Sequence, residues 1–166
     1  MAYTKTLYIP LEVIDRELGG ALLMAVEAIS RGWTVVLGGK QAIFNNMSRF
    51  SDSPGIFFLK SVVPGEVFKQ KEIAAFGHAV VSLDVEGLVP SNGKAGVCLR
   101  YSDESIQLSD LLFFWGREHY EAVCSVYPQI KEVARISGSP IIDEVKVRGA
   151  KFIKGENVQK KKKILI

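Results

Sequence analysis

The sequence predicts an α/β fold in which about six parallel strands form one Rossmann-like sheet with helices on both faces. Short apolar runs of strand length alternate along the chain with segments of helical periodicity. Most of these runs lack the apolar and polar alternation of a half-exposed sheet, as expected for strands covered on both faces. The length of 166 residues, 48% of them hydrophobic, suits one domain and leaves little room for a second complete one.

The first strand, helix and second strand show the clearest patterns. Residues 7–11 form an apolar run of strand length, and Asp15 is expected to cap the helix that follows. Gly32 is expected to end that helix, and residues 33–37 form a β-branched, apolar strand expected to be covered on both faces. The helix repeats apolar residues at steps of three and four, which predicts one buried stripe formed by Leu18, Leu22, Ala25, Val26 and Ile29.

The remaining elements continue the alternation. Glycines at positions 77 and 116 separate helical from apolar segments and mark element boundaries, and the Ser, Asn and Gly residues of segment 90–96 favour a loop. The further strands are expected at residues 55–59, 78–83, 111–115 and 133–137, and the further helices at residues 42–50, 66–76, 103–109 and 117–127.

Charge and cysteine content exclude several classes of protein. Residues 146–166 hold eight basic residues and one acidic residue, which leaves 13 basic and 17 acidic residues in segment 1–145. A nucleic-acid partner is not expected, because such a binder carries a basic face on its folded body. Cys98 and Cys124 form no C-x-x-C pair or disulfide framework, and the sequence shows no signal peptide or membrane span, so we expect a cytoplasmic protein.

Ligands of an open parallel sheet bind at the carboxyl ends of its strands, so the loops there hold the candidate site. Asp84 and Glu86 follow the fourth predicted strand, where one carboxylate could take a proton from a sugar hydroxyl. The alternative is that Asp84 caps a turn and Glu86 is solvated. No residue is expected to bind a metal ion.

Two other groups lie on expected loops of the same edge. Glu12, Arg16 and Glu17 follow the first strand and could bind a polar ligand through charge-assisted hydrogen bonds, or could simply be an exposed ion pair at a helix start. His119 lies in the first turn of a helix and is a candidate ligand contact. Gly38-Gly39-Lys40 does not match a phosphate-binding P-loop, so nucleotide binding is not expected there.

Several motifs, in order, resemble the N-terminal half of bacterial surface-carbohydrate biosynthesis proteins. The resemblance covers nearly the whole chain. It is carried by the LYIPLE run at residues 7–12, by REL at 16–18, by the arginine and glycine at 31 and 32 that lead into VVLG at 35–38, by LDVEG at 83–87, by FFWG at 113–116, by YP at 127–128 and by GSPIID at 138–143.

This resemblance implies one lobe of a GT-B-like glycosyltransferase, similar to Kdo transferases and polysialyltransferases and acting on capsule, lipopolysaccharide or a similar polymer. In those families an acidic residue before a glycine carries the catalytic base, so Glu86 is the candidate, with Asp84 beside it. The chain lacks the family's His-Pro dipeptide and has Ser139 where asparagine is expected, which puts the ligand role of that loop in doubt. The substrate-binding candidates are Glu12, Arg16, Glu17, Gly87, Gly116, His119 and Ser139.

On this interpretation residues 1–145 form the acceptor-side lobe, and residues 146–166 form a basic interdomain segment and the first strand of a second lobe. The expected partners are a saccharide acceptor and that donor-binding lobe, which would hold a nucleotide-activated sugar such as a CMP-linked one. No cofactor is expected in this lobe. Lys160 to Lys163 could instead contact anionic lipid at the inner membrane face. The alternative function is a free-standing, non-enzymatic Rossmann-like module that binds a small polar ligand or a partner domain.

Overall fold

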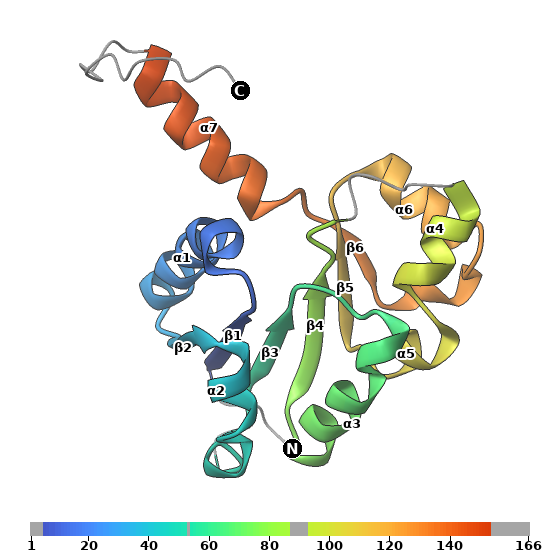
Figure 1. Ribbon diagram of the computed structural model, residues 1–166, viewed down its shortest axis with the longest axis horizontal. Coiled ribbons are helices and arrows are strands. Elements are labelled where there is room, and N and C mark those ends of the chain that lie inside the picture. Colours follow the sequence, from blue (N-terminus) through green and yellow to red (C-terminus); the bar gives the residue numbers. More distant parts are fainter. Residues whose placement is uncertain (1–4, 53, 87–92, 154–166) are drawn as a thin grey trace, which may run out of the picture.

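The computed structural model describes residues 5–52, 54–86 and 93–153, and these form a single parallel sheet with helices on both faces (Figure 1). The strand order is β2-β1-β3-β4-β5-β6, and every pair of neighbours is parallel. The predicted Rossmann-like α/β fold is therefore confirmed. The strands are β1 (Thr6–Leu11), β2 (Thr34–Gly39), β3 (Ile56–Leu59), β4 (Ala79–Leu83), β5 (Leu111–Phe114) and β6 (Ala134–Ile136).

The helices form two unequal layers. The strand order reverses at β1, and right-handed crossovers then place the helix before the reversal and the helices after it on opposite faces. In the described part of the chain, α1 and the start of α7 lie on one face, and α2 to α6 lie on the other. The helices are α1 (Ile14–Ser30), α2 (Lys40–Phe44), α3 (Val67–Ala75), α4 (Gly93–Arg100), α5 (Asp103–Gln107), α6 (Arg117–Cys124) and α7 (Pro140–Ile153), with short 3-10 turns at Met47–Arg49, Pro64–Glu66 and Pro128–Glu132.

The larger core lies between the sheet and helices α2 to α6. Tyr8 and Phe57 stack at its centre with ring centroids 4.6 Å apart, and Phe114 and Ile130 close its other end. The smaller core lies under α1, where the strand residues Ile9 and Leu11 meet small helix side chains. The sheet is thus fixed mainly by side chains on one of its faces.

Two expectations about α1 are wrong. The helix is preceded by Val13 at the N-cap and begins at Ile14, so Asp15 lies inside the first turn and does not cap it. Leu22, Val26 and Ile29 are 46%, 66% and 58% exposed, so the predicted buried stripe does not form. The reason is close packing: α1 turns a small-residue face that includes Gly20 toward the sheet and α7, since a Cβ at Gly20 would lie 3.3 Å from the backbone nitrogen of Ile141.

The expectation that the second strand is covered on both faces is also wrong. Strand β2 is the edge of the sheet, and its residues are half-buried or exposed. The fully apolar pattern of residues 33–37 does not distinguish an edge strand from a central one, because β2 is placed by the reversal of strand order rather than by its own composition.

Element boundaries differ in three further places. The expected loop at 90–96 is wrong at residues 93–96, which begin helix α4. The expected helix at 42–50 divides into α2 and the 3-10 turn at Met47–Arg49. The expected boundary between residues 145 and 146 falls within α7, and the strand expected at the end of the chain lies outside the described residues, as does Gly87.

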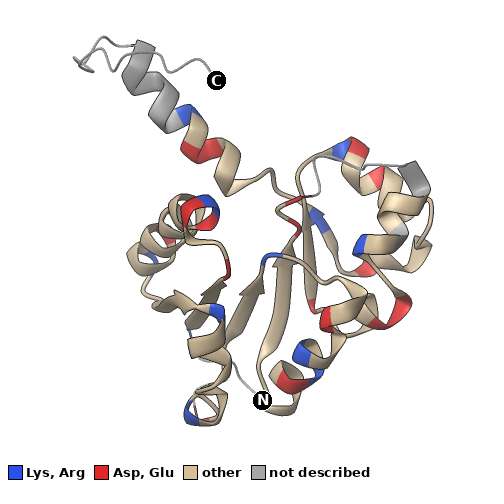
Figure 2. Ribbon diagram, viewed as in Figure 1, with Lys and Arg blue, Asp and Glu red and all other residues tan. Residues whose placement is uncertain are grey.

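Glycine ends two helices as expected. Gly32 after α1 and Gly77 after α3 have φ angles of 78° and 79°, in the left-handed region that glycine adopts without strain. Figure 2 shows basic and acidic residues intermixed on α1, α3 and α6. No helix within the described ranges is long and apolar enough to cross a membrane.

Candidate functional site

A cavity of about 1040 Å³ opens at the carboxyl ends of β4, β5 and β6. Helices α4 and α6 and the start of α7 form its walls. The sequence predicted a site at this edge of the sheet, and five of the candidate residues line the cavity. The lining candidates are Asp84, Glu86, Gly116, His119 and Ser139.

Asp84 is the buried residue of the polar cluster in this cavity. Its side chain is only 3% exposed, and both of its oxygens accept hydrogen bonds from the guanidinium of Arg100, with 2.7 Å between Arg100 Nε and Asp84 Oδ2. The Glu86 backbone N–H also donates to Asp84 Oδ1 at 3.0 Å. Asp84 therefore shapes the turn and orients Arg100, and its lone pairs are engaged.

Glu86 lies at the rim, with a side chain that is 52% exposed. Arg100 donates from Nη1 to Glu86 Oε2 at 2.7 Å, and Arg16 of α1 approaches Glu86 Oε1 at 3.5 Å. Arg100 thus bonds both carboxylates and offsets the repulsion between them. Of the two acidic candidates, Glu86 is the one that a ligand can reach.

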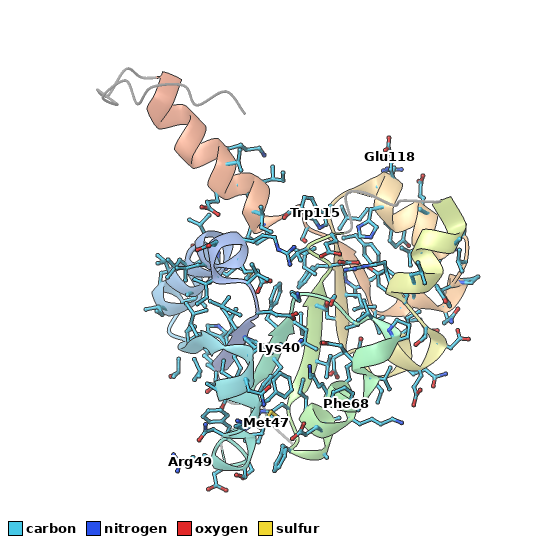
Figure 3. The ribbon with its side chains drawn as sticks, in the orientation of Figure 1. Lys40, Met47, Arg49, Phe68, Trp115 and Glu118 are labelled. Atoms are coloured by element: carbon cyan, nitrogen blue, oxygen red, sulfur yellow. The ribbon has the colours of Figure 1, made fainter. Side chains whose placement is uncertain are left out.

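The β5 to α6 connection is tied to the end of β4. Trp115 donates its indole N–H to the backbone carbonyl of Asp84 at 2.5 Å, which fixes the ring in the cavity wall. Figure 3 shows Trp115 near the junction of the sheet with α7, and shows the Glu118 side chain directed outward from α6. Gly116 follows Trp115 as the N-cap residue of α6.

His119 lies in the first turn of α6, with its ring against Phe114 at a centroid distance of 4.9 Å. Its Nδ1 is buried and has no hydrogen-bond partner in the described part of the chain. Burial lowers the pKa of His119 below its usual 6.5, although the charge of Asp84 opposes that effect. The neutral form of the ring is therefore favoured, and its buried Nδ1 is an unsatisfied polar atom beside the cavity.

Ser139 immediately precedes α7 and is 5% exposed. The residue lines the cavity, and its hydroxyl oxygen is buried with no hydrogen-bond partner among the described residues. The backbone before it is held in place, because the N–H groups of Ser137 and Gly138 both donate to the carbonyl of Phe114, at 3.0 and 3.3 Å. Ser139 therefore occupies a fixed position beside the start of α6.

The remaining candidates, Glu12, Arg16 and Glu17, form a separate cluster at the ends of β1 and β3, where the strand order reverses. Glu12 lies 2.9 Å from Lys40 Nζ and 3.0 Å from Lys60 Nζ, and its hydrogen bonds to Lys40 and Lys60 lower its pKa to about 2. Buried Glu17 accepts a hydrogen bond from the Glu12 backbone N–H at 2.8 Å. These residues do not line the large cavity within the described structure, and Arg16 connects the two clusters through Glu86.

Arg100, Trp115 and Lys60 are site residues that sequence reasoning missed. Arg100 lies 14 and 16 positions from the two carboxylates it bonds, and no local spacing signals that contact. Trp115 and Lys60 could have been found, because each follows directly at the carboxyl end of a strand and the loop rule that selected Gly116 applies to them equally.

Within the described ranges, no group of three or more His, Cys, Asp or Glu side chains is placed to bind a metal ion. The site is thus a partly apolar cavity with an acidic rim residue, a buried Asp–Arg pair, an indole wall and two buried polar atoms without partners among the described residues. Comparisons of the chain with protein-family models, with curated proteins and with solved structures found no match.

Proposed function

We propose that this chain is the acceptor-side lobe of a glycosyltransferase that builds a bacterial surface polysaccharide, and that its large cavity binds the saccharide acceptor. The observation that carries the proposal is the position of Glu86, a half-exposed carboxylate on the rim of a cavity of about 1040 Å³. Asp84 below it is fully engaged with Arg100, so the two carboxylates have separate roles.

In the proposed reaction Glu86 acts as general base. Its carboxylate accepts the proton of an acceptor hydroxyl as that oxygen bonds to the anomeric carbon of an activated sugar, and the bond from that carbon to the nucleotide phosphate breaks. Arg100 and Arg16 hold the carboxylate at the rim, and Asp84 holds Arg100. The nucleotide-activated donor is a substrate that a second lobe would supply.

The cavity wall is suited to a saccharide. The ring of Trp115, fixed by its hydrogen bond to Asp84, offers a flat apolar surface on which a sugar ring can stack. His119 Nδ1 and the Ser139 hydroxyl are buried polar atoms that sugar hydroxyl groups could satisfy. Ligand sites usually have this composition, in which a small number of polar groups lie in a partly apolar pocket.

The second candidate is a non-enzymatic module that binds a small polar ligand in the same cavity. The observation that favours it is the pairing of both Glu86 oxygens with arginines, at 2.7 and 3.5 Å. A general base must accept the acceptor hydroxyl on a lone pair that the arginines leave open, whereas a binding module can use the carboxylate paired as it is. The two functions therefore differ in what the Glu86 carboxylate does.

The deciding variant is Glu86→Gln, with Glu121→Gln as the matched control, because Glu121 is an exposed glutamate of α6 that does not line the cavity. In a protein that carries this lobe together with a donor-binding lobe, we expect Glu86→Gln to lower the rate of sugar transfer by roughly a hundredfold or more. Glu121→Gln should leave the rate unchanged. Normal transfer by Glu86→Gln would remove Glu86 from the mechanism and favour the binding module.

A second experiment tests whether this lobe binds the saccharide but needs a second lobe for sugar transfer. The 166-residue chain alone should bind methyl glycosides in the cavity, detected as shifts of the Trp115 indole resonance in NMR spectra, and should not transfer sugar. Transfer by this chain alone would contradict the need for a second lobe. Failure of every glycoside to shift Trp115 would contradict saccharide binding.

A further inference from the structure

Two helices begin at the same cavity. Gly116 is the N-cap residue of α6 and makes no side-chain cap, so the first backbone N–H groups of α6 have no partner from a capping side chain. Helix α7 begins at Pro140, directly after Ser139. Because Ser137 and Gly138 donate to the carbonyl of Phe114, the chain entering α7 is fixed beside the chain entering α6.

The Ser139 hydroxyl is an independent sign of a ligand at this place. The residue is 5% exposed and lines the cavity, and its hydroxyl oxygen is buried and lacks a partner within the described structure. A buried hydroxyl without a hydrogen bond is unfavourable, and a serine before a helix usually bonds the backbone of that helix. This hydroxyl does not, and it remains free to bond a group that enters between the two helix starts.

The charges around the two helix starts are mixed, and one arginine among them is unpaired in the described part of the chain. Arg117, the first residue of α6, lines the cavity and makes no ion pair or hydrogen bond among the described residues. Of the acidic residues that line the cavity, Asp84 and Glu86 bond Arg100. Asp143, in the first turn of α7, lies 3.5 Å from Lys146, and Glu118, in the first turn of α6, points away from the body (Figure 3). Helix N-termini carry a partial positive charge and free N–H donors, which together bind phosphate groups.

We propose that the starts of α6 and α7, with the Ser139 hydroxyl and Arg117, form a binding subsite for a phosphate group. The inference rests on the proposed function and deepens it, since the acceptor saccharide would then carry a phosphate. The phosphate oxygens accept hydrogen bonds from the N–H groups of α6 and from Ser139, and Arg117 supplies the counter-charge. Glu86 remains at the rim, where a hydroxyl of the same ligand can reach it.

The test is an NMR titration of the ¹⁵N-labelled chain with three probes: inorganic phosphate, a hexose 1-phosphate and the matching methyl hexoside. We expect phosphate to cause saturable shifts of the Arg117 to His119 amides and the Ile141 and Ile142 amides. The hexose 1-phosphate should bind at least tenfold more tightly than the methyl hexoside. Ser139→Ala should weaken phosphate binding about tenfold, the effect expected for one hydrogen bond to a charged group.

Two matched variants serve as controls. Ser82→Ala removes another buried serine hydroxyl without a partner, on β4 and outside the cavity wall, and should leave phosphate binding unchanged. Arg117→Gln should weaken binding about threefold, whereas Arg31→Gln, at an exposed arginine beyond the end of α1, should not. The wild-type amide shifts decide the question even if Ser139→Ala does not fold.

The proposal is overturned if phosphate shifts no amide of the two helix starts, or if Ser139→Ala and Arg117→Gln bind phosphate as the wild type does. The probes separate this failure from failure of the proposed function. Binding of the methyl hexoside without phosphate binding would remove the subsite and leave the saccharide site intact. Binding of inorganic phosphate with no effect of either sugar would retain the subsite and contradict saccharide binding.

Discussion

Arg100 at the end of α4 bonds both carboxylate oxygens of Asp84 at the end of β4, with 2.7 Å between Nε and Oδ2. The pair joins the helix that forms one wall of the cavity to the strand that forms its floor. The same guanidinium donates to Glu86 at the rim, so the position of the Glu86 carboxylate depends on the buried Asp84 carboxylate that holds Arg100.

Asp84→Asn should lower the stability of the fold more than Glu86→Gln does. Asp84 is 3% exposed, and removing its charge leaves Arg100 with a weaker partner, at a cost of about 2–3 kcal/mol. Glu86 is half exposed, and its ion pairs are worth at most about 1 kcal/mol. Urea unfolding of both variants measures the difference, and the reverse order would show that Asp84 is not the structural member of the pair.

Gly55→Ala should be strongly destabilising. A Cβ at position 55 would overlap the backbone carbonyl oxygen of Thr6, at the start of β1, and backbone there cannot move without disturbing the sheet. We expect a loss of roughly 2–4 kcal/mol in the free energy of unfolding. Gly65→Ala is the control, because no atom lies within 4 Å of its added methyl group. Equal stability of the two variants would contradict the close approach.

Gly19 and Gly20 should respond differently to substitution, although both lie where α1 meets α7. An alanine at Gly19 meets the carboxyl end of the Glu144 side chain, which has to shift, so the gain in helix propensity of about 1 kcal/mol is partly offset and the net change in stability should be small. A valine at Gly20 meets the backbone of Pro140 and Ile141 and should displace α7. Hydrogen exchange of the α7 amides measures the release, which should occur in Gly20→Val alone.

The free energy of unfolding should fall as the pH drops below about 6.5. Burial lowers the pKa of His78 and of His119, and His78 Nδ1 accepts a hydrogen bond from the Gly55 N–H at 3.1 Å, which requires an unprotonated nitrogen. The unfolded state then binds more protons than the folded state, so stability is lost as pH falls through the unfolded pKa of about 6.5 toward the lower folded values. Urea midpoints from pH 7.5 to 5 measure this slope. NMR titration of the two ring resonances should give folded pKa values below 6.5, and a value above it for either histidine would contradict the assignment.

Lys40→Gln should raise the pKa of Glu12 from about 2. The hydrogen bond from Lys40 is the largest cause of the low value, and Lys60 alone would keep only part of the effect. Lys71→Gln is a suitable control because Lys71 pairs with Glu104, on another part of the surface. A ¹³C titration of the Glu12 carboxyl distinguishes the outcomes, and an unchanged pKa would show that Lys40 does not govern this group.

Local chain physics explains how much of the fold could be predicted. Each strand is a short apolar run, and glycines such as Gly32 and Gly77 mark helix ends because their φ angles are positive. What a single element does not encode is its place in the sheet. Strand β2 has the composition of a central strand and lies at the edge, and Leu22, Val26 and Ile29 repeat like a core stripe but face solvent because small residues occupy the contact with the sheet.

The edge of the sheet that holds the candidate site could be predicted from the sequence, but not every residue of the site. The rule that ligands bind at the carboxyl ends of parallel strands selected Glu86, Gly116 and His119, which line one cavity, and the family resemblance added Ser139, which lines it too. The rule could not separate that cavity from the cluster around Glu12, because both lie on the same edge. Arg100 could not be predicted, since its helix reaches Asp84 through the tertiary fold rather than through spacing in the sequence.

The two helix layers differ greatly in depth. Sixteen buried apolar residues support the layer of α2 to α6, against four under α1, counted over the described residues. Regions with fewer buried contacts open at a lower free energy, so thermal fluctuation should expose the α1 side of the sheet first. Helices α4 and α6, which carry much of the cavity wall, belong to the deeper layer, so this wall can persist through motions that detach the opposite side.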